Sequence, residues 1–398
     1  MSPKTLRVGL VGLGLRSGVA RYVDTVGHDA EVTAVCDLLP ARRAKAAELY
    51  PNAAAFEDLD QLLDRGIDAV IIATPDHTHE ELVIAALRAE VPVFVEKPLA
   101  ITIEGSDRIL HTAYETGTKV YVGHNMRHMP VITTMRRLIQ EGHIGEVKSI
   151  WCRHFVGHGG DYYFKDWHAD RRHTTGLLLQ KGAHDIDVIH WLASGRTTHV
   201  SAIGDLMVYG DITARGGQGE RTMGEWFDPN IWPPTEQTGL NDIVDVEDLS
   251  MVQMTLDNGV LASYQQCHFS PDYWRNYTVI GTHGRLENFG DSAGAVVKIW
   301  NSHRSGYRED TDLEVTVEAE SGGHGGADPR LIREFLDFVR DGAPTQTSPV
   351  AARDAVAAGC AATESLRQGG GALPVPALDA SVQRYFEENQ RKSVTRGA

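Results

Sequence analysis

Cysteine is scarce in this chain, and the few cysteines lie far apart. The sequence of 398 residues contains only four, Cys36, Cys152, Cys267 and Cys360. No two of them form a CxxC pair, and four scattered thiols do not make the disulfide framework of a small secreted domain. The sequence therefore predicts a protein of a reducing compartment, and we expect a cytoplasmic location.

Positive charge and long apolar runs are also scarce. Lysine and arginine total 38 against 54 acidic residues, which gives a formal net charge of −16. Nucleic acids and anionic membranes both require a basic face, so neither is expected as a partner. No apolar run approaches the ~20 residues of a membrane-spanning helix. Residues 1–4 lead into a predicted strand without the apolar core of a signal peptide.

The remaining composition is that of an ordinary globular protein. Hydrophobic residues make up 42% of the chain and charged residues 23%. A chain of 398 residues is too long for a single hydrophobic core. We therefore expect two domains, and the patterns described below place their boundary between residues 124 and 125.

A glycine-rich turn follows the first predicted strand. Residues 6–11 form an apolar strand, residues 12–18 read GLGLRSG, and a helix is predicted from there to about residue 26. This strand–turn–helix order is the context that a dinucleotide fingerprint requires. Gly12 makes the tight turn, and Gly14 lets the backbone approach a pyrophosphate at the helix N-terminus. The turn predicts cofactor contacts at Gly12, Gly14, Leu15, Arg16 and Ser17.

An acidic residue ends the second predicted strand. Asp37 lies 37 − 12 = 25 residues after Gly12. A carboxylate at this place hydrogen-bonds the adenosine ribose and disfavours a 2′-phosphate, so NAD is expected rather than NADP. Arg42 and Arg43 follow in the next helix and weaken this preference, because an arginine there can hold a 2′-phosphate.

Strands and helices alternate through the first third of the chain. Strands are predicted at residues 31–36, 68–73, 93–95 and 119–123, with helices at 40–50, 59–65, 80–89 and 102–116. This alternation predicts a doubly wound parallel sheet, a Rossmann domain over residues 1–124. Glu96, Lys97 and Pro98 follow one of these strands directly, and the carboxyl end of such a strand faces the ligand crevice. Lys97 is therefore predicted to face a cofactor or a substrate.

The pattern changes from about residue 130. Helices are predicted at 130–140, 177–193, 329–340 and 348–368, and strands at 147–154, 200–209, 249–256, 260–268, 277–281, 285–288 and 296–300. Turns such as residues 257–259 (DNG) indicate a mostly antiparallel open sheet, so residues 125–398 are predicted to form an α+β domain. Residues 211–248 have no clear period, and we interpret them as an insertion structured by packing or by a neighbouring subunit.

These motifs together resemble a known family. The glycine turn, the segment TPDxxH from Thr74 to His79, and the Glu-Lys-Pro tripeptide around Lys97 are similar to the glucose–fructose oxidoreductase/inositol dehydrogenase (Gfo/Idh/MocA) family. The resemblance covers nearly the whole chain. It implies an NAD(P)-dependent oxidoreductase that acts on a sugar, sugar derivative or cyclitol, with NADP the less expected cofactor and Lys97 the catalytic lysine.

The resemblance also implies further site residues and an assembly. Thr74, Pro75, His79 and Glu96 would line the nicotinamide half of the cofactor site. Residues 123–127 resemble the family's link into the second domain. Asn125 would contact both cofactor and substrate there, and Arg127 the substrate. The exposed sheet face is usually an oligomer interface in this family, which implies a homodimer or homotetramer.

A second group of candidate residues lies in the predicted helix 177–193. Gln180 and His184 are four residues apart, so they share one helical face. Family members typically have an acid at the first position and a histidine at the second, facing the nicotinamide. His184 matches and would assist Lys97. Gln180 replaces the acid, which argues against a charge relay there but leaves a hydrogen bond to a substrate hydroxyl.

Histidines are numerous, which raises the question of a metal. His154, His158, Asp161, His168 and His173 lie close in sequence, but their spacing matches no zinc template and no metal is expected. Aromatic faces and bidentate donors suit polyols. We therefore interpret Trp167 and His168, with Arg171 and Arg172, as one wall of a sugar pocket, although a plain surface loop also fits.

The sequence leaves three functions open. The first is hydride transfer between a sugar or cyclitol hydroxyl carbon and a nicotinamide, with Lys97 as acid/base. The second is a glycosidase or lyase that uses tightly bound NAD for a transient oxidation followed by elimination. The third is a non-catalytic, NAD-responsive binding protein, against which Lys97 argues. The sugar, the oxidised carbon and the physiological direction are not determined by the sequence.

Overall fold

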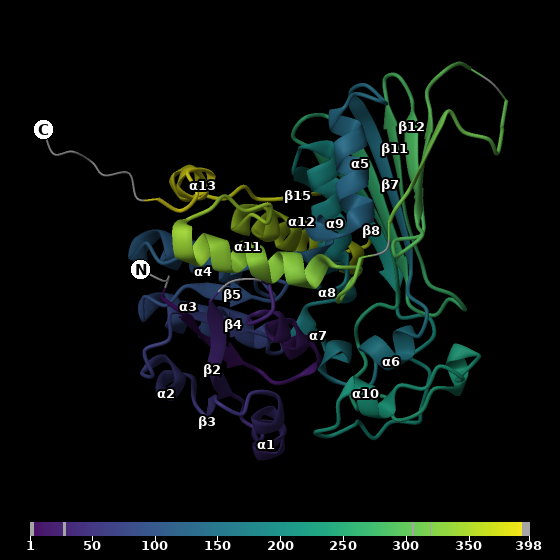
Figure 1. The fold of residues 1–398 in the computed structure, drawn as a ribbon. Helices are drawn as coiled ribbons and strands as arrows, with labels where there is room; N and C mark the ends of the chain where they lie inside the picture. The colour runs from purple at the N-terminus through teal and green to yellow at the C-terminus, as the bar shows by residue number, and fades with distance from the viewer. Residues whose placement is uncertain (1–3, 27–28, 305, 319, 392–398) are drawn as a thin grey trace, which may run out of the picture. The chain divides into compact units, whose positions relative to one another are not determined.

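The computed structural model describes residues 4–26, 29–304, 306–318 and 320–391, which divide into two compact units (Figure 1). The first unit is Met1–His124, Asp328–Arg353 and Ala377–Ala398, and the second is Asn125–Ala327 and Asp354–Pro376. The sequence analysis placed everything after residue 124 in one domain, whereas two later segments belong to the first unit. The expectation that residues 1–4 lead directly into a strand lies, for residues 1–3, outside the described residues.

A parallel sheet forms the centre of the first unit. The described strands follow the order β3-β2-β1-β4-β5-β6, and each neighbouring pair is parallel. This confirms the predicted doubly wound sheet, whose strand order reverses between β1 and β4. The strands are β1 (Leu6–Val11), β2 (Ala30–Cys36), β3 (Ala54–Phe56), β4 (Ala69–Ile72), β5 (Val93–Val95) and β6 (Val120–Val122).

Most helices of this unit begin and end where the sequence predicts. They are α1 (Pro40–Leu49), α2 (Leu59–Leu63), η2 (Asp76–Thr78), α3 (His79–Arg88) and α4 (Ile103–Thr116). Two predictions need correction. The helix expected to reach residue 26 is a 3-10 helix, η1 (Leu15–Tyr22), and Ser17 donates to the Gly14 carbonyl in the tighter i→i−3 pattern. The edge strand β3 was missed, because it has only three residues and two of them are alanines, which have little preference for strands.

The later segments join the first unit through aromatic packing. Helix α11 (Ala327–Asp341) places Leu331, Phe335 and Phe338 in the same core as Val8 and Phe94. The Phe335 and Phe94 ring centroids are 5.5 Å apart, edge to face. Helix α13 (Ala380–Glu387) was not predicted. Tyr385 of this helix lies edge-on to Tyr114 of α4 at 5.4 Å, so burial of apolar rings explains why the chain returns.

A nine-stranded sheet forms the centre of the second unit, with its described strands in the order β14-β13-β12-β11-β7-β10-β9-β8-β15. Strands β7 and β10 pair in parallel and the other neighbouring pairs are antiparallel, which confirms the predicted mostly antiparallel sheet. The strands are β7 (Val147–Phe155), β8 (Thr197–Asp205), β9 (Leu249–Leu256), β10 (Leu261–Cys267), β11 (Trp274–Gly281), β12 (Arg285–Phe289), β13 (Val296–Trp300), β14 (Leu313–Thr316) and β15 (Leu373–Pro374). The short edge strands β14 and β15 were missed.

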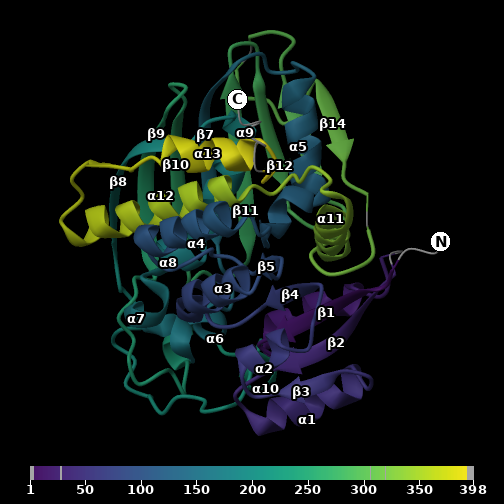
Figure 2. The same cartoon turned by 90° about the vertical axis from the view of Figure 1, so that its left-hand side faces the viewer.

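Helices cover one face of this sheet, as Figures 1 and 2 show for α5 and α9. The helices of the unit are η3 (Asn125–His128), α5 (Pro130–Gln140), α6 (Gly159–Tyr163), η4 (Trp167–Ala169), α7 (Arg171–Thr174), α8 (Leu177–Gln180), α9 (Gly182–Ala193), α10 (Met223–Trp226), η5 (Pro234–Glu236) and most of α12 (Pro349–Arg367). The single helix predicted at 177–193 is interrupted at Lys181, although Lys181 itself keeps a right-handed helical backbone.

Asp248 shortens the strand that was predicted to run to residue 209. Strand β8 ends at Asp205, and the next backbone N–H groups turn toward the Asp248 carboxylate instead of a neighbouring strand. Met207, Val208 and Tyr209 donate to it at 2.8, 2.8 and 2.9 Å. Three backbone donors satisfied by one buried carboxylate explain why the strand stops here.

The insertion 211–248 packs against its own chain. Gln237 donates to the buried carboxylate of Asp161 at 2.9 Å, and the Trp226 indole donates to the Asp161 carbonyl at 2.9 Å. The buried ammonium of Lys165 lies 2.7 Å from the same carboxylate. Leu240 belongs to a core with Phe164 and other residues of the preceding loop. Contacts within the chain thus support this segment, as one of the two expectations proposed.

The outer face of the nine-stranded sheet carries large apolar side chains. Trp151 is 50% exposed, Leu261 58% and Ile203 60%.

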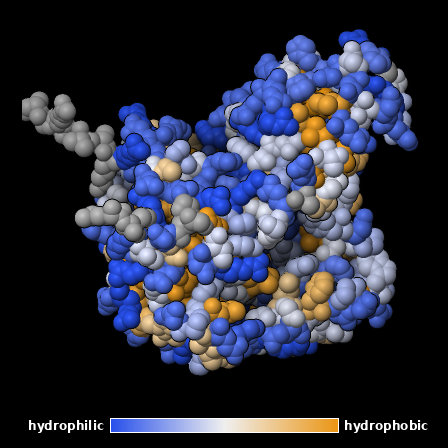
Figure 3. Space-filling view, in the orientation of Figure 1, coloured by the Kyte–Doolittle hydropathy of each residue, from blue (hydrophilic) through white to orange (hydrophobic). Residues whose placement is uncertain are grey.

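The surface that faces the viewer in Figure 1 is mainly hydrophilic, and its hydrophobic residues form separate small groups (Figure 3). This agrees with the acidic composition of the chain. Among the residues that the structure describes, no helix has the length and apolarity needed to cross a membrane.

Candidate active site

The glycine turn is shaped for close approach of a ligand backbone. Gly12 has a φ of +85°, and a Cβ atom there would lie 2.7 Å from the Ala73 carbonyl oxygen, so only glycine fits. A Cβ on Gly14 would meet nothing within 4 Å, and the neighbouring Leu15 is 62% exposed. The turn therefore leaves open space beside Gly14, as a pyrophosphate would need.

Asp37 joins this turn to the end of β2. Its carboxylate accepts hydrogen bonds from the backbone N–H of Leu13 at 2.8 Å and of Leu39 at 2.9 Å. The two arginines that follow behave differently. A guanidinium nitrogen of Arg42 lies 3.8 Å from the Asp37 carboxylate, whereas Arg43 donates to the backbone carbonyl of Asp37 at 2.6 Å. Arg43 thus supports the backbone, and Arg42 is the arginine beside the carboxylate.

Arg16 binds acidic side chains of its own unit. Its guanidinium lies 2.7 Å from Glu96 and 3.4 Å from Asp328. Burial lowers the pKa of Arg16, but the Glu96 and Asp328 carboxylates outweigh burial and raise it overall. The glycine turn is thereby tied to the tripeptide that contains Lys97. Sequence reasoning expected Arg16 at the cofactor and did not foresee this contact.

The loops after β4 and β5 place their polar residues differently. Every residue of the described segment 93–100 is buried except Lys97, which is partly exposed at the carboxyl end of β5. Thr74 and Pro75, at the carboxyl end of β4, are also partly exposed. His79 has no exposed surface at all, and its ring nitrogens lie 2.7 Å from the Pro98 carbonyl oxygen and 3.0 Å from that of Thr74.

In the second unit, the link residues are buried. Asn125 is the first residue of η3 and is 4% exposed. Arg127 donates to the Asp187 carboxylate from two nitrogens, at 2.8 and 2.7 Å, and lies over the Trp191 ring at 5.5 Å. The pair is buried on both sides. These contacts hold η3 against α9, so the guanidinium of Arg127 serves the packing of the unit.

Gln180 ends α8 and His184 lies in the first turns of α9. In the described segment 177–193, the residues that retain exposure are Lys181, His184 and Trp191. Gln180 is 5% exposed. The side chains at positions 181 and 184 are thus the points at which the start of α9 meets solvent or a ligand.

Aromatic and imidazole rings cluster in the loop before α8. Trp167 stacks on His168 with centroids 3.7 Å apart, and Tyr163 lies edge-on to His168 at 5.5 Å and to His268 at 5.1 Å. The Lys181 ammonium lies 5.8 Å from the Tyr163 ring. The structure therefore brings the predicted Trp167 and His168 together with Tyr163, Lys181 and His268, which the sequence analysis did not propose.

His268 directly follows β10, which ends at Cys267. Its place at the end of a predicted strand is the sequence signal that could have identified it. The residue is fully buried, and its two ring nitrogens have no hydrogen-bond partner. Burial lowers its pKa well below the usual range, and the nearby His154 and Lys181 lower it further, so the ring is neutral at neutral pH. The neutral imidazole packs edge-on against the rings of Tyr163 and Phe164.

A buried polar network lies beneath His184. The carboxylate of Asp185 is fully buried and accepts from His154 at 2.8 Å, from the Tyr264 hydroxyl at 3.0 Å and from the Tyr277 hydroxyl. The Arg275 guanidinium lies 3.2 Å from it. Burial raises the pKa of Asp185, but Arg275 and His154 lower it below its ordinary value. The network holds α9 to strands β7, β10 and β11.

The histidines considered for a metal are engaged elsewhere. His154 bonds to Asp185, His158 lies edge-on to Phe227 at 5.1 Å, and His168 lies 2.6 Å from Asp166. Within the described part of the chain, no group of three or more histidine, cysteine or acidic residues is placed to hold a metal ion.

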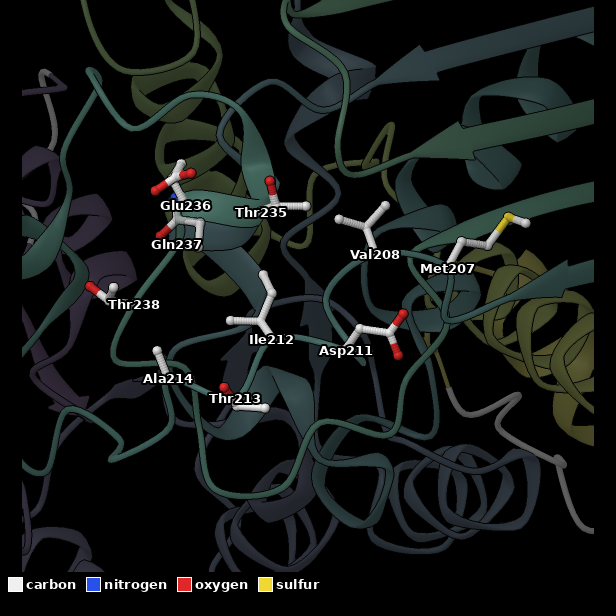
Figure 4. Close-up of a pocket in the computed structure, with 10 residues that line it drawn as sticks. All are labelled: Met207, Val208, Asp211, Ile212, Thr213, Ala214, Thr235, Glu236, Gln237 and Thr238. Atoms are coloured by element: carbon white, nitrogen blue, oxygen red, sulfur yellow. The ribbon is translucent and has the colours of Figure 1, made fainter.

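A cavity of about 410 Å³ lies in the insertion (Figure 4). It contains none of the residues that sequence reasoning proposed. Asp211 and Glu236 contribute carboxylates to it, and Ile212 and Val208 contribute apolar surface. Its wall is completed by Met207, Thr213, Ala214, Thr235, Gln237 and Thr238.

Comparison with known proteins assigns both units. Residues 6–124 match the family model described as the oxidoreductase family (Gfo/Idh/MocA), NAD-binding Rossmann fold, and residues 136–376 match its C-terminal alpha/beta domain. The Bacillus subtilis protein YteT, named as an oxidoreductase, is 25% identical over 352 residues, which are 77% of this chain and 82% of that protein.

Other relatives match over part of their length or in fold only. Inositol 2-dehydrogenase of Corynebacterium glutamicum is 32% identical over 202 residues, 50% of this chain and 57% of that protein. The structure of levoglucosan dehydrogenase with NADH and levoglucosan has a TM-score of 0.77 at 20% identity, covering 94% of this chain and 100% of that one. That of GenD2 from gentamicin A biosynthesis, with NAD, has a TM-score of 0.72 at 21% identity, covering 95% and 98%. At such identities the two structures show a shared fold.

Proposed function

Because the chain belongs to the Gfo/Idh/MocA family of oxidoreductases and has its NAD-binding Rossmann domain, we propose that it is an NAD-dependent sugar or polyol dehydrogenase. It transfers a hydride between a hydroxyl-bearing carbon of a sugar, sugar derivative or cyclitol and the nicotinamide. Relatives named for inositol and levoglucosan support this substrate class. The observation that carries the proposal is Lys97, the partly exposed amine at the carboxyl end of β5 in an otherwise buried segment.

The first unit has the groups that NAD requires. The open space beside Gly14 suits the pyrophosphate, and the Asp37 carboxylate suits a ribose hydroxyl. Thr74, Pro75 and Glu96 are proposed to face the nicotinamide half. NAD supplies the hydride acceptor when it is bound, and the chain supplies the proton chemistry and the orientation of the substrate.

Each proposed residue has a defined task. Lys97 accepts the proton of the substrate hydroxyl, because that proton must leave the oxygen as the carbon is oxidised. His184 assists as a second acid/base. Gln180 and Asn125 donate or accept hydrogen bonds at neighbouring hydroxyls, and Trp167 with His168 offers ring faces to the sugar. We propose a packing role for Arg127, because two of its nitrogens donate to the buried Asp187 carboxylate.

We also propose that the protein is a homodimer or homotetramer that pairs through the outer face of the nine-stranded sheet. The apolar side chains of Trp151, Leu261 and Ile203 on that face support this assembly. Light scattering coupled to gel filtration measures the state directly.

A panel of sugars and polyols, assayed with NAD and with NADP at the NADH absorbance band, tests the function. We expect NADH formation with at least one sugar or cyclitol, and a rate lower by about 100-fold or more with the Lys97→Met variant. A protein that retains NAD through purification but forms no NADH, while it cleaves a glycoside, would instead be the transient-oxidation glycosidase. A protein that does not bind NAD would contradict the proposal.

Cofactor choice gives a first specific prediction. NADH is expected to bind more tightly than NADPH, because the 2′-phosphate would face the Asp37 carboxylate. Asp37→Ala and Asp37→Asn should both reduce the ratio of NADH affinity to NADPH affinity by about tenfold, which equals about 1.4 kcal/mol. Asparagine keeps a side-chain oxygen that can accept from the N–H groups of Leu13 and Leu39, whereas alanine does not. Comparison of the two variants therefore separates the effect of the lost charge from the effect of the lost hydrogen bonds. Calorimetric titration measures both affinities.

The two arginines provide the matched control. Adding Arg42→Ala to Asp37→Asn should remove the gain in NADPH affinity, because Arg42 is the arginine beside the carboxylate. Arg42→Ala alone should leave NADH affinity almost unchanged. If the unmodified protein binds NADPH more tightly than NADH, the assignment of Asp37 is wrong.

The Gln180–His184 pair gives a second prediction. A carboxylate one turn before His184 would favour its protonated form, because opposite charges stabilise each other. Gln180→Glu should therefore move the acidic limb of the kcat/KM pH profile to higher pH by a fraction of a unit or more. A simultaneous rise in KM would show that Gln180 also binds a substrate hydroxyl. If neither Gln180→Glu nor His184→Asn moves the limb, His184 is not the titrating group.

A further inference from the structure

The loops after β4 and β5 are joined by a single buried side chain. His79, the first residue of α3, is fully buried. Its Nδ1 lies 2.7 Å from the carbonyl oxygen of Pro98, the residue after Lys97, and its Nε2 lies 3.0 Å from the carbonyl oxygen of Thr74. One imidazole thus spans the backbone of the Glu-Lys-Pro tripeptide and that of the Thr-Pro-Asp turn.

The chemistry of the two contacts is one-sided. A carbonyl oxygen can only accept and a neutral imidazole has one N–H group, so the ring donates to one of the two carbonyls. At 2.7 Å, the contact of Nδ1 to Pro98 is at the short end of the range for an N–H···O bond, and it is the stronger constraint on the backbone beside Lys97. Because His79 has no exposed surface, water does not compete for this bond.

Other contacts brace the same two loops but not the backbone after Lys97. The Thr78 hydroxyl lies 2.7 Å from both the Thr74 hydroxyl and the Pro75 carbonyl. The Glu96 N–H donates to the Ile72 carbonyl at 2.9 Å, which continues the pairing of β4 with β5 up to the residue before Lys97. Beyond Lys97, the contact of His79 with the Pro98 carbonyl connects the tripeptide to the first residue of α3.

We propose that His79 is a positioning residue: its imidazole lies between the two loops, donates from Nδ1 to the Pro98 carbonyl and so fixes the backbone that aims the Lys97 ammonium. The resemblance to the family implied a place for His79 at the nicotinamide, and its complete burial favours this role behind the loops instead. The catalytic part of the inference rests on the proposed role of Lys97. The contact itself does not, so it is tested separately.

The variant His79→Phe removes both ring nitrogens and keeps a planar ring, whereas His79→Gln keeps an N–H donor. The matched control is Thr118→Val. Thr118 is also a buried residue of the first unit that donates to a backbone carbonyl, that of Leu87 at 3.0 Å. Circular dichroism and urea unfolding establish that each variant is folded, and His79→Gln keeps the test possible if His79→Phe does not fold.

The first readout needs no substrate. Each purified protein is treated with an amine-acylating reagent, and the rate of modification at Lys97 is measured by peptide mass spectrometry. We expect His79→Phe to change this rate severalfold, His79→Gln to change it less, and Thr118→Val to leave it unchanged. A Lys97 rate in His79→Phe equal to that in Thr118→Val would overturn the proposal, whatever reaction the protein catalyses.

The second readout uses the substrate found in the panel. Misplacement of a reacting group by about 1 Å can cost up to about 100-fold in rate. We therefore expect kcat of His79→Phe to fall by about tenfold or more, with a much smaller change in the substrate KM. Partial recovery in His79→Gln supports the hydrogen bond as the cause. An unchanged kcat, or a fall that Thr118→Val reproduces, contradicts a positioning role.

Discussion

The Lys97→Met variant is expected to lose turnover by about 100-fold or more while it still binds NAD. Methionine has a similar apolar stem but no titrating group, so the change removes proton transfer with little loss of packing. Lys97 is the partly exposed residue of the otherwise buried segment 93–100, which supports its proposed contact with a ligand. Steady-state kinetics with the panel substrate and calorimetric titration with NAD measure the two effects.

Lys148→Met is the matched control for this variant. The side chain of Lys148, on β7, is 54% exposed and pairs with Glu146. Removal of its ammonium group should therefore leave kcat unchanged. Activity of Lys97→Met close to that of the unmodified protein would remove Lys97 from the mechanism. A large loss of NAD affinity in Lys97→Met would show that the ammonium serves binding rather than proton transfer.

The Asp185→Asn variant is expected to lower the free energy of unfolding by about 3–5 kcal/mol. The carboxylate is fully buried and faces the Arg275 guanidinium at 3.2 Å. The substitution removes one negative charge beside the buried Arg275, which keeps the Asp291 carboxylate 3.3 Å away. Burial and the Arg275 guanidinium lower the pKa of His154 to about 3, so this histidine is neutral. It therefore cannot compensate for the change in charge at position 185. Urea unfolding measures the difference.

The pH dependence of this variant provides an internal check. The pKa of Asp185 is depressed in the folded state, so its stabilising contribution is present above the unfolded value of about 3.9 and is lost as the pH falls below it. The stability gap between the unmodified protein and Asp185→Asn should therefore narrow below about pH 4. Glu141→Gln, which removes an exposed partner of Arg137, should cause no measurable change. A change of less than about 1 kcal/mol in the free energy of unfolding of Asp185→Asn at neutral pH would contradict a stabilising role of this buried carboxylate.

The first unit was the part of the fold that sequence patterns predicted best. Its strands are short buried apolar runs and its helices have clear beginnings, such as Thr102, whose side chain accepts from the Gly105 N–H ahead of α4. The edge strand β3 was not predicted, because it has only three residues and two of them are alanines. The tight geometry of η1 was not predicted, because an apolar pattern does not distinguish a 3-10 helix from an α-helix in so short a segment. The return of α11 and α13 to this unit was also missed, since amphipathic periodicity shows that a helix packs but not against which sheet.

For the candidate site, residue type and tertiary contact led to different assignments. Arg16, His79 and Arg127 were predicted to touch cofactor or substrate, and the structure shows their polar atoms bonded to Glu96, to two backbone carbonyls and to Asp187. Conversely, Tyr163 and His268 were not proposed, and they lie with His168 in one ring cluster. A motif identifies polar residues near a site but does not show which of them are bonded within the protein.

The sequence by itself determined the class of protein: a glycine turn after the first strand and an acid at the end of the second predicted an NAD-binding Rossmann domain. The glycine turn, the Thr74–His79 segment and the Glu-Lys-Pro tripeptide resembled the Gfo/Idh/MocA family, to which the chain belongs. These features are local, so their spacing along the chain is sufficient to predict them. The tertiary structure alone decided the partners of the buried polar groups, such as Asp185 with Arg275 and Tyr264. Those residues are separated by about 80–90 positions, and buried polar groups must find partners wherever the fold brings them, which no short-range pattern records.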